Sequence, residues 1–219
     1  MPTERFLRLP KEKAEIIRRA AIEEFKRVPP EDASINKIIQ AAEISRGSFY
    51  TYFEDKYDLL KWLMGDFIGN YRRGYLDGLL EHDGDLWKVF DQVFRHTVQW
   101  VDEQGLVEIV GNMMKGTYFS EQMTNGSSGG CELEAENRDY AEILYRHVDP
   151  ACCTLETEEF HELMSMHAAS LIVSLKMYFT GEKSMDEVEK MYLRRMKLLR
   201  YGACPQRTQS EHEIRKGQE

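Results

Sequence analysis

The sequence lacks several features that would place it in common classes of protein. It does not open with a charged segment followed by an apolar one, as a secretory signal does, and none of its apolar runs approaches the roughly 20 residues of a membrane span. These absences predict a cytoplasmic protein that does not enter a membrane. The cysteines show no C-x-x-C spacing and are expected to be free thiols in a reducing compartment: Cys131, Cys152, Cys153 and Cys204.

Motifs of common enzymes and metal sites are also missing. Neither H-E-x-x-H nor G-x-S-x-G occurs, and His161 and His167 do not share a helix face as two metal ligands would. The stretch 124–130 has no following Lys-Ser or Lys-Thr, so it predicts a flexible loop rather than a phosphate-binding one. Adjacent Cys152 and Cys153 are interpreted as ordinary thiols in preference to a redox or soft-metal site. We predict no enzymatic activity, no metal and no cofactor.

An excess of positive charge, which would attract DNA phosphates, is absent as well. The net charge is −9, but residues 1–58 hold 11 Lys/Arg and 11 Asp/Glu, whereas residues 59–219 hold 18 and 27. The acidity therefore belongs to the second part of the chain. Any phosphate binding must come from locally placed cations and helix N-termini.

What the sequence does contain is a nearly continuous series of helical patterns. Apolar residues at three- and four-residue spacing predict helices over 11–27, 35–42, 46–53, 56–80, 86–103, 106–118, 133–148, 155–180 and 184–201. Residues 82–85 are expected to form a turn and residues 203–219 a disordered tail. Residues 1–10 are expected to be a solvated arm, with Arg5 and Arg8 reaching a DNA groove or a phosphate as the alternative. The predicted fold class is all-α.

Residues 34–56 predict a helix-turn-helix. Ser34 and Ser45 stand where each short helix begins, with hydroxyls able to accept from amides of the first turn. Phe49 and Phe53, four residues apart, are expected to face inward, and Asp55 to cap the next helix. Two short helices joined by a tight turn place the second helix in the DNA major groove.

The residues of this stretch form a longer pattern. It consists of Ser34-Ile35 through Ile38, Ala42-Glu43-Ile44-Ser45, Arg46-Gly47-Ser48-Phe49-Tyr50-Thr51-Tyr52-Phe53 and Lys56, with Ile17, Ala20, Ala21 and Phe25 upstream. The pattern, over about residues 11–64, resembles the DNA-binding domain of TetR-type transcriptional regulators. The resemblance implies a three-helix DNA-binding domain over residues 1–55 and a helical effector-binding and dimerisation domain over residues 56–202. Glu43 stands where that family usually has glycine, and a left-handed backbone there would cost roughly 1–2 kcal/mol.

Candidate DNA contacts lie on the outer side of this motif. They are Ser34, Lys37, Ser45, Arg46, Gly47, Ser48, Tyr50, Thr51, Tyr52 and Lys56. Arg46 is predicted to bind a guanine edge, with a phosphate contact or a solvated side chain as alternatives. Tyr50 and Tyr52 resemble phosphate-binding positions, with partial packing under the motif as the alternative. Lys56 opposes the helix dipole at its position, which a phosphate partner would explain.

Methionine and aromatic side chains in residues 86–180 are compatible with plain core or with an adaptable pocket. The resemblance implies an effector cavity, which we predict near Phe94, Trp100, Tyr118, His167 and Tyr178, for an apolar or aromatic ligand. The last helix is apolar on two sides and needs a second surface to cover it. We predict a homodimer whose interface includes Leu171, Met177, Met191, Leu193 and Met196.

Together these features predict a homodimeric repressor that binds palindromic double-stranded operator DNA and is released by a small-molecule effector. The helix over 56–80 is expected to transmit the ligand signal, as the one continuous element that joins the motif to the second domain. The alternative is a helical ligand- or partner-binding protein without operator binding, which Glu43 and the acidic balance keep open.

Overall fold

Helices form all the regular structure that this computed structural model describes, residues 2–116 and 130–202. They are α1 (Glu4–Leu7), α2 (Lys11–Arg27), the short 3-10 helix η1 (Pro30–Asp32), α3 (Ile35–Ala41), α4 (Arg46–Tyr52), α5 (Lys56–Leu63), α6 (Gly65–Glu81), α7 (Leu86–Glu103), α8 (Val107–Lys115), α10 (Gly130–Tyr145), α11 (Thr157–Phe179) and α12 (Met185–Tyr201). The predicted all-α fold class is confirmed.

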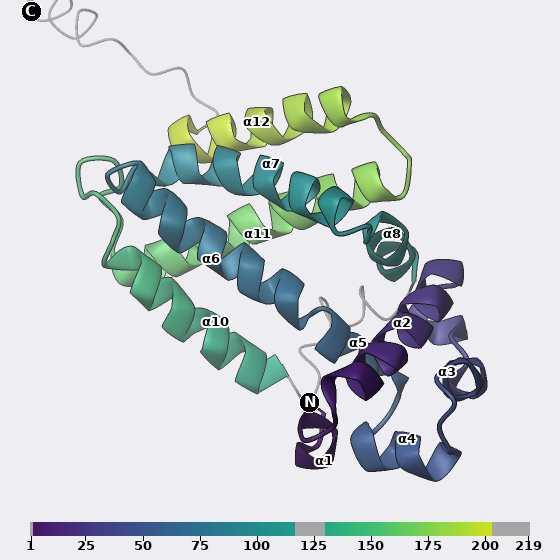
Figure 1. The fold of residues 1–219 in the computed structure, drawn as a ribbon. Helices are drawn as coiled ribbons and strands as arrows, with labels where there is room; N and C mark the ends of the chain where they lie inside the picture. The colour runs from purple at the N-terminus through teal and green to yellow at the C-terminus, as the bar shows by residue number, and fades with distance from the viewer. Residues whose placement is uncertain (1, 117–129, 203–219) are drawn as a thin grey trace, which may run out of the picture.

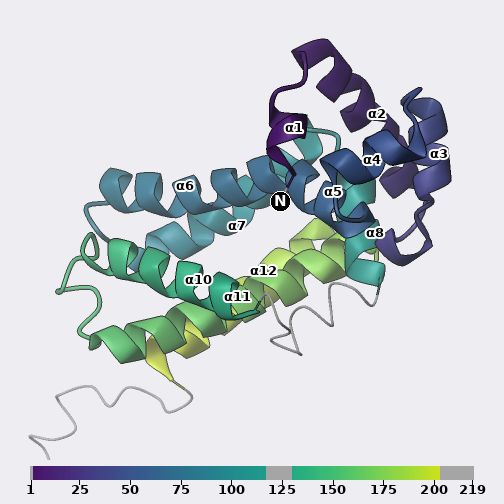
Figure 2. The same cartoon turned by 90° about the horizontal axis from the view of Figure 1, so that it is seen from below.

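The helices gather into two groups. Figure 1 shows α1 to α5 at one end of the molecule and the long helices α6, α7, α10, α11 and α12 at the other. Figure 2 shows the same division from below. In the second group α6 packs on α7 and α11 packs on α12, while α8 lies between the groups and contacts both α2 and α11.

Each group has an apolar core made by residues at helical spacing. The first buries Ile17, Phe25, Ile38, Phe49 and Phe53, and the second buries Tyr75, Phe90, Phe94, Phe160 and Tyr192, all of them at most 1% exposed. Burying one such side chain contributes about 1.5–3 kcal/mol. Small residues permit close helix packing in the second group, since a Cβ at Gly78 of α6 would lie 3.2 Å from Val89 of α7.

The prediction of a solvated N-terminal arm is wrong for residues 3–9. Residues 4–7 form α1, and Phe6 is only 3% exposed because its ring packs on those of Phe53 and Trp62, with centroids 4.6 and 4.8 Å away. Burial of the aromatic ring favours the docked segment and opposes its loss of conformational entropy.

The predicted continuous helix over 56–80 is also wrong. It is interrupted at Met64, whose φ and ψ of −86° and −1° end α5, and α6 begins at Gly65. Glycine in a helix interior costs roughly 0.5–1 kcal/mol relative to alanine, which favours a break at this point. Because Met64 is buried, tertiary packing holds the interruption in place.

The later helices follow the predicted order with shifted ends. α10 ends at Tyr145, earlier than predicted, and α8 ends at Lys115. Ser184 and Glu187 form the capping box expected ahead of α12. The predicted loop over 124–129, Tyr118 and the tail over 203–219 lie outside the described residues.

Candidate DNA-binding site

Local side-chain caps set the ends of the helix-turn-helix. The Ser34 hydroxyl accepts from the Lys37 amide at the start of α3, and the Ser45 hydroxyl accepts from the Ser48 amide, 3.0 Å away, at the start of α4. Asp55 accepts from two amides of α5, both at 2.8 Å. Each cap satisfies amides that have no partner inside a helix.

The turn between α3 and α4 contains a residue in the left-handed conformation. Glu43 has a φ of 52°, at the position where the resemblance predicted it. The Ile44 amide donates to the Ile39 carbonyl over 3.0 Å and closes the end of α3. The turn thus forms without glycine, which removes one of the two reasons for doubting a DNA-binding motif.

α4 presents a polar face to solvent. Phe49 and the following Phe53 are completely buried beneath it. The predicted contacts Ser45, Arg46, Gly47 and Tyr50 are exposed, and Ser48, Thr51 and Tyr52 are half-buried. Figure 1 shows α4 on the side of its group away from α6, α7, α11 and α12. The helix is therefore accessible along the side that the motif would present to DNA.

Arg46 is held in place by a residue that the sequence did not single out. Its Nη1 donates to Oδ1 of Asn36 over 2.7 Å, and its guanidinium lies 5.6 Å from the ring centre of Tyr50. Asn36 projects from α3, so one helix of the motif orients the candidate base-reading side chain of the other. No spacing rule relates residues 36 and 46, which lie on different helices.

Lys56 has backbone partners. Its ammonium donates to the carbonyls of Glu31 and Ala33, in the segment that connects α2 to α3. An ammonium has three hydrogens, so a further acceptor can bind. The lysine thus ties the start of α5 to the approach to α3, and a phosphate contact there stays a prediction.

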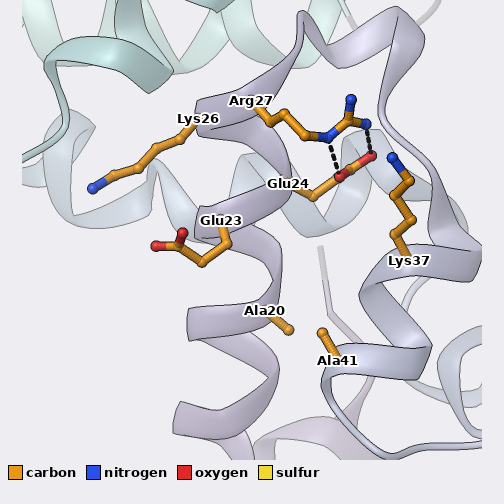
Figure 3. A pocket seen from close by; sticks show the side chains of 7 residues that line it. All are labelled: Ala20, Glu23, Glu24, Lys26, Arg27, Lys37 and Ala41. Atoms are coloured by element: carbon orange, nitrogen blue, oxygen red, sulfur yellow. Dashed lines mark hydrogen bonds and ion pairs between the residues drawn. The ribbon is translucent and has the colours of Figure 1, made fainter.

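A cavity of about 480 Å³ lies between α2 and α3 (Figure 3). It is lined by Ala20, Glu23, Glu24, Lys26, Arg27, Lys37 and Ala41. Glu24 is buried and accepts from Arg27 Nε and Nη2 at 2.9 and 2.7 Å and from the Ser34 amide at 2.8 Å. The Arg27 hydrogen bonds are the main reason that the pKa of Glu24 is lowered. Glu24 thus connects α2 to the start of α3 through the Ser34 amide.

His167, one of the predicted effector-site residues, is a core residue in this structure. It is fully buried, its Nδ1 lies 2.8 Å from the Tyr75 hydroxyl, and its Nε2 lies 2.7 Å from the Tyr192 hydroxyl. Tyr192 donates its hydrogen to the Phe90 carbonyl, so Nε2 must donate to Tyr192 and Nδ1 must accept from Tyr75. Burial lowers the pKa of His167 to about 3, so that the ring is neutral.

The remaining predicted pocket residues are dispersed. Phe94 is 1% exposed and stacks on Tyr192, with centroids 4.4 Å apart, so it too belongs to the core. Trp100 is half-buried and packs on Phe67, and Tyr178 is half-buried and packs on Phe179. A side chain that lined an open cavity would keep accessible surface, and Trp100 and Tyr178 do so among the predicted pocket residues that the structure describes.

Comparisons with known proteins agree with this geometry. The family model of bacterial regulatory proteins of the tetR family matches residues 17–63, and that of the Tetracyclin repressor-like C-terminal domain matches residues 85–203. The two matches cover most of the chain. The chain belongs to the TetR family. It is therefore a DNA-binding transcriptional regulator and not an enzyme, as predicted.

Two solved TetR-family structures share its fold. One is a putative TetR-family transcriptional regulator from Syntrophomonas wolfei, with a TM-score of 0.55, 21% identity, and 90% of this chain and 99% of that chain covered. The other is a cysteine mutant of CifR in complex with a 26 bp operator, with a TM-score of 0.55, 22% identity, and 86% and 95% covered. No curated protein matches.

The predicted dimer residues of this TetR-family chain differ in exposure, and their role at an interface stays a prediction. Leu171 and Met196 are 2% and 5% exposed and face the core of their own protomer. Apolar side chains that α11 and α12 do expose are different ones: Met166 (53%), Val173 (42%), Leu198 (52%) and Tyr201 (44%). Met177, Met191 and Leu193 are half-buried.

α8 joins the two domains of the regulator. Nδ2 of Asn112 donates to the carbonyls of Phe25 and Lys26, 3.0 and 2.7 Å away, in the last turn of α2. The neighbouring Gly111 faces the end of α11, where a Cβ would lie 2.7 Å from the Phe179 carbonyl oxygen. One short helix thus touches the DNA-binding domain and the C-terminal domain through adjacent residues.

Other candidate chemistry is weak in the described part of the chain. Burial, followed by the nearby Asp85 and Asp149, raises the pKa of the Cys152 thiol, which disfavours the reactive thiolate. Within residues 2–116 and 138–202, no His, Cys, Asp and Glu side chains gather into a metal-binding group. In those same ranges no helix has the length and apolar character that crossing a bilayer requires.

Proposed function

We propose that this TetR-family regulator is a homodimeric repressor that binds a palindromic operator and releases it when an apolar or aromatic ligand binds its C-terminal domain. The observation that carries the proposal is the accessible polar face of α4 in a chain whose α11 and α12 leave apolar side chains uncovered. The CifR structure contains operator DNA, which supports operator binding by this chain as well.

The proposed DNA contacts are the predicted residues of the motif. Arg46 reads a base edge while Asn36 orients it, and Ser34, Lys37, Tyr50 and Lys56 meet phosphates. Two α4 helices of a dimer would enter successive major grooves about 34–36 Å apart. Selection of bound duplexes from a random pool tests this, since a dimer should yield a consensus of two inverted half-sites. A consensus of one unrepeated half-site would contradict the palindromic operator.

The proposed dimer is built from the exposed faces of α11 and α12. Met166 and Val173 are seven residues apart on α11, so they lie on one face, as do Leu198 and Tyr201 on α12. A partner that buried these side chains would recover the favourable transfer of apolar surface from water.

Charge substitutions test this interface. Val173→Glu and Leu198→Glu should sediment as monomers at micromolar concentration. Leu80→Glu is the matched control, because Leu80 is 64% exposed but lies on α6, and it should stay dimeric. A monomeric wild-type protein, or a dimer that survives both substitutions, would reject the proposed interface.

The proposed ligand signal runs through α8 instead of a single long helix. A ligand bound near Trp100 and Tyr178 would displace α8, and Asn112 would pass the displacement to the end of α2. The ligand can shift DNA binding only by its differential affinity for two arrangements, typically about 1–3 kcal/mol. Reciprocity requires operator DNA to weaken ligand binding by the same factor.

The probes for this test are hydrophobic compounds that raise the melting temperature of the protein. One that binds should release the selected duplex, and Asn112→Ala should reduce the release while leaving compound affinity in the absence of DNA unchanged. If a saturating compound stabilises the protein but leaves duplex affinity unaltered, the induction mechanism is wrong. Unchanged release in Asn112→Ala would place the route elsewhere.

A further inference from the structure

The N-terminal segment before the family motif is attached to the end of the recognition helix. The Thr3 amide donates to the Tyr52 carbonyl over 2.9 Å, and the Thr3 hydroxyl donates to the Thr51 carbonyl over 2.7 Å. The last carbonyls of a helix have no partner within it. Thr3 therefore supplies a cap for the C-terminal end of α4 from a point 48 residues away along the chain.

Phe6 makes the same attachment with its ring. It is 3% exposed, and it packs on Phe53, which follows α4, on Trp62 of α5 and on Tyr52, with centroids 4.6, 4.8 and 5.9 Å away. The Phe6 ring thus contacts both the recognition helix α4 and the next helix, α5. Figure 1 shows α1 beside one end of α4.

The recognition helix needs such support because it is short. α4 has seven residues, fewer than the roughly 12–15 at which an isolated helix becomes even marginally stable in water. Its geometry must come from packing and from its two ends. Ser45 fixes the first end and Thr3 with Phe6 fixes the second.

We propose that Thr3 and Phe6 are positioning residues for DNA recognition, which hold α4 at the angle at which its side chains reach base edges. The match to the tetR family model begins at residue 17, so Thr3 and Phe6 lie outside the matched segment. The cations of the segment are not needed for it, since Arg5 is exposed and Arg8 pairs with Glu4 over 2.6 Å.

Affinity for two duplexes tests the proposal: one selected from a random pool by the wild-type protein, and one of the same length with its sequence scrambled. Phe6→Ala should bind the selected duplex about tenfold more weakly, the equivalent of one lost base contact. It should bind the scrambled duplex like the wild type and keep the same salt dependence. Phe6→Leu should recover most of the affinity, and Thr3→Val should show a smaller loss of the same kind.

Leu7→Ala is the matched control, because Leu7 lies in the same short helix but is 67% exposed, and it should bind both duplexes normally. Amide exchange in α4 should be faster in Phe6→Ala and unchanged in α7. Wild-type affinity in Phe6→Ala and Thr3→Val would overturn the proposal. So would a loss that is equal on both duplexes, or one that Arg5→Ala with Arg8→Ala reproduces together with a shallower salt dependence.

If Phe6→Ala does not fold, Thr3→Val decides alone, since Thr3 is exposed and its substitution leaves the core intact. If Thr3→Val prefers the selected duplex as strongly as the wild type does, the positioning role is rejected. A reduced preference would support it.

Discussion

Glu24 in the DNA-binding domain and His167 in the C-terminal domain are both buried polar side chains, but they have different kinds of partner. Glu24 is held by Arg27 and Ser34, three and ten residues away in sequence. His167 is held by Tyr75 and Tyr192, which are 92 and 25 residues away. The first group accepts hydrogen bonds that favour its charged form, whereas burial keeps the second neutral.

The difference shows how each domain is specified. In the DNA-binding domain, neighbours along the chain fix the starts of α3, α4 and α5 and the turn, and Thr3 and Lys56 add contacts from farther along the chain. In the C-terminal domain, a chain of hydroxyls and one imidazole connects α6, α7, α11 and α12. All four helices must assemble before every one of these groups is satisfied, which couples their positions to one another.

The largest expected effect lies in the C-terminal domain. An unfolded histidine binds a proton near pH 6.5, whereas His167 has a pKa of about 3 in the fold. Because the folded pKa is the lower one, acid protonates His167 in the unfolded state first. The free energy of unfolding therefore has its full value above pH 6.5 and decreases as the pH falls toward 3. Urea unfolding between pH 7 and pH 5 should show a loss of about 1.4 kcal/mol per pH unit from this group below pH 6.5.

His167→Leu separates this group from others. At pH 7 it should lower the free energy of unfolding by about 3 kcal/mol, since the hydroxyls of Tyr75 and Tyr192 lose a buried partner. Below pH 6.5 it should flatten the pH dependence. If the slope persists in the variant, a group other than His167 sets the pH dependence.

A smaller effect is expected at Glu24 and its hydrogen-bond partners. Glu24→Ala should lower the free energy of unfolding by about 2 kcal/mol, because the Ser34 amide loses its acceptor and Arg27 its partner. The folded pKa of Glu24 lies below the usual 4.5, so its contribution is present above pH 4.5 and is lost as the pH falls below that value. Glu23→Ala, an exposed neighbour on the same cavity, should unfold like the wild type.

Substitutions at Arg46 and Asn36 test whether the contact between α3 and α4 also sets the recognition of a DNA base. Arg46→Ala should weaken binding to the selected duplex by about 1–3 kcal/mol and relax one base position in each half-site. Asn36→Ala should have a smaller effect at the same position, because it frees Arg46 without removing it. Gel-shift titrations on duplexes that vary at that position measure both. An equal loss on every sequence would make Arg46 a phosphate contact.

The smallest change is expected at Lys56. Lys56→Ala should weaken all duplexes alike and make the slope of log affinity against log salt shallower by about 0.9 per half-site. An unaltered slope with a lower melting temperature would instead assign the lysine to its backbone partners, the carbonyls of Glu31 and Ala33. The salt titration therefore separates a DNA contact from an internal brace.

Prediction from sequence succeeded where a signal and its partner lie within one or two helical turns. Ser34, Ser45 and Asp55 cap the helices predicted for them, and the capping box at Ser184 is present. It failed where the partner lies far away along the chain, as for Phe6 in the predicted solvated arm. Leu171 and Met196 have the same apolar character whether they face their own core or a second chain, and only the packing of α11 on α12 separates these cases.

By itself, then, the sequence determined the family, the all-α class and the helix-turn-helix, because helix periodicity and capping act over three or four residues. Tertiary structure alone decided that Phe6 docks beside α4, that α5 ends at Met64, that Asn112 caps α2 and that His167 is a closed core group. Each of these depends on a surface formed by residues far away in the chain, and burial rewards the contact only once that surface exists.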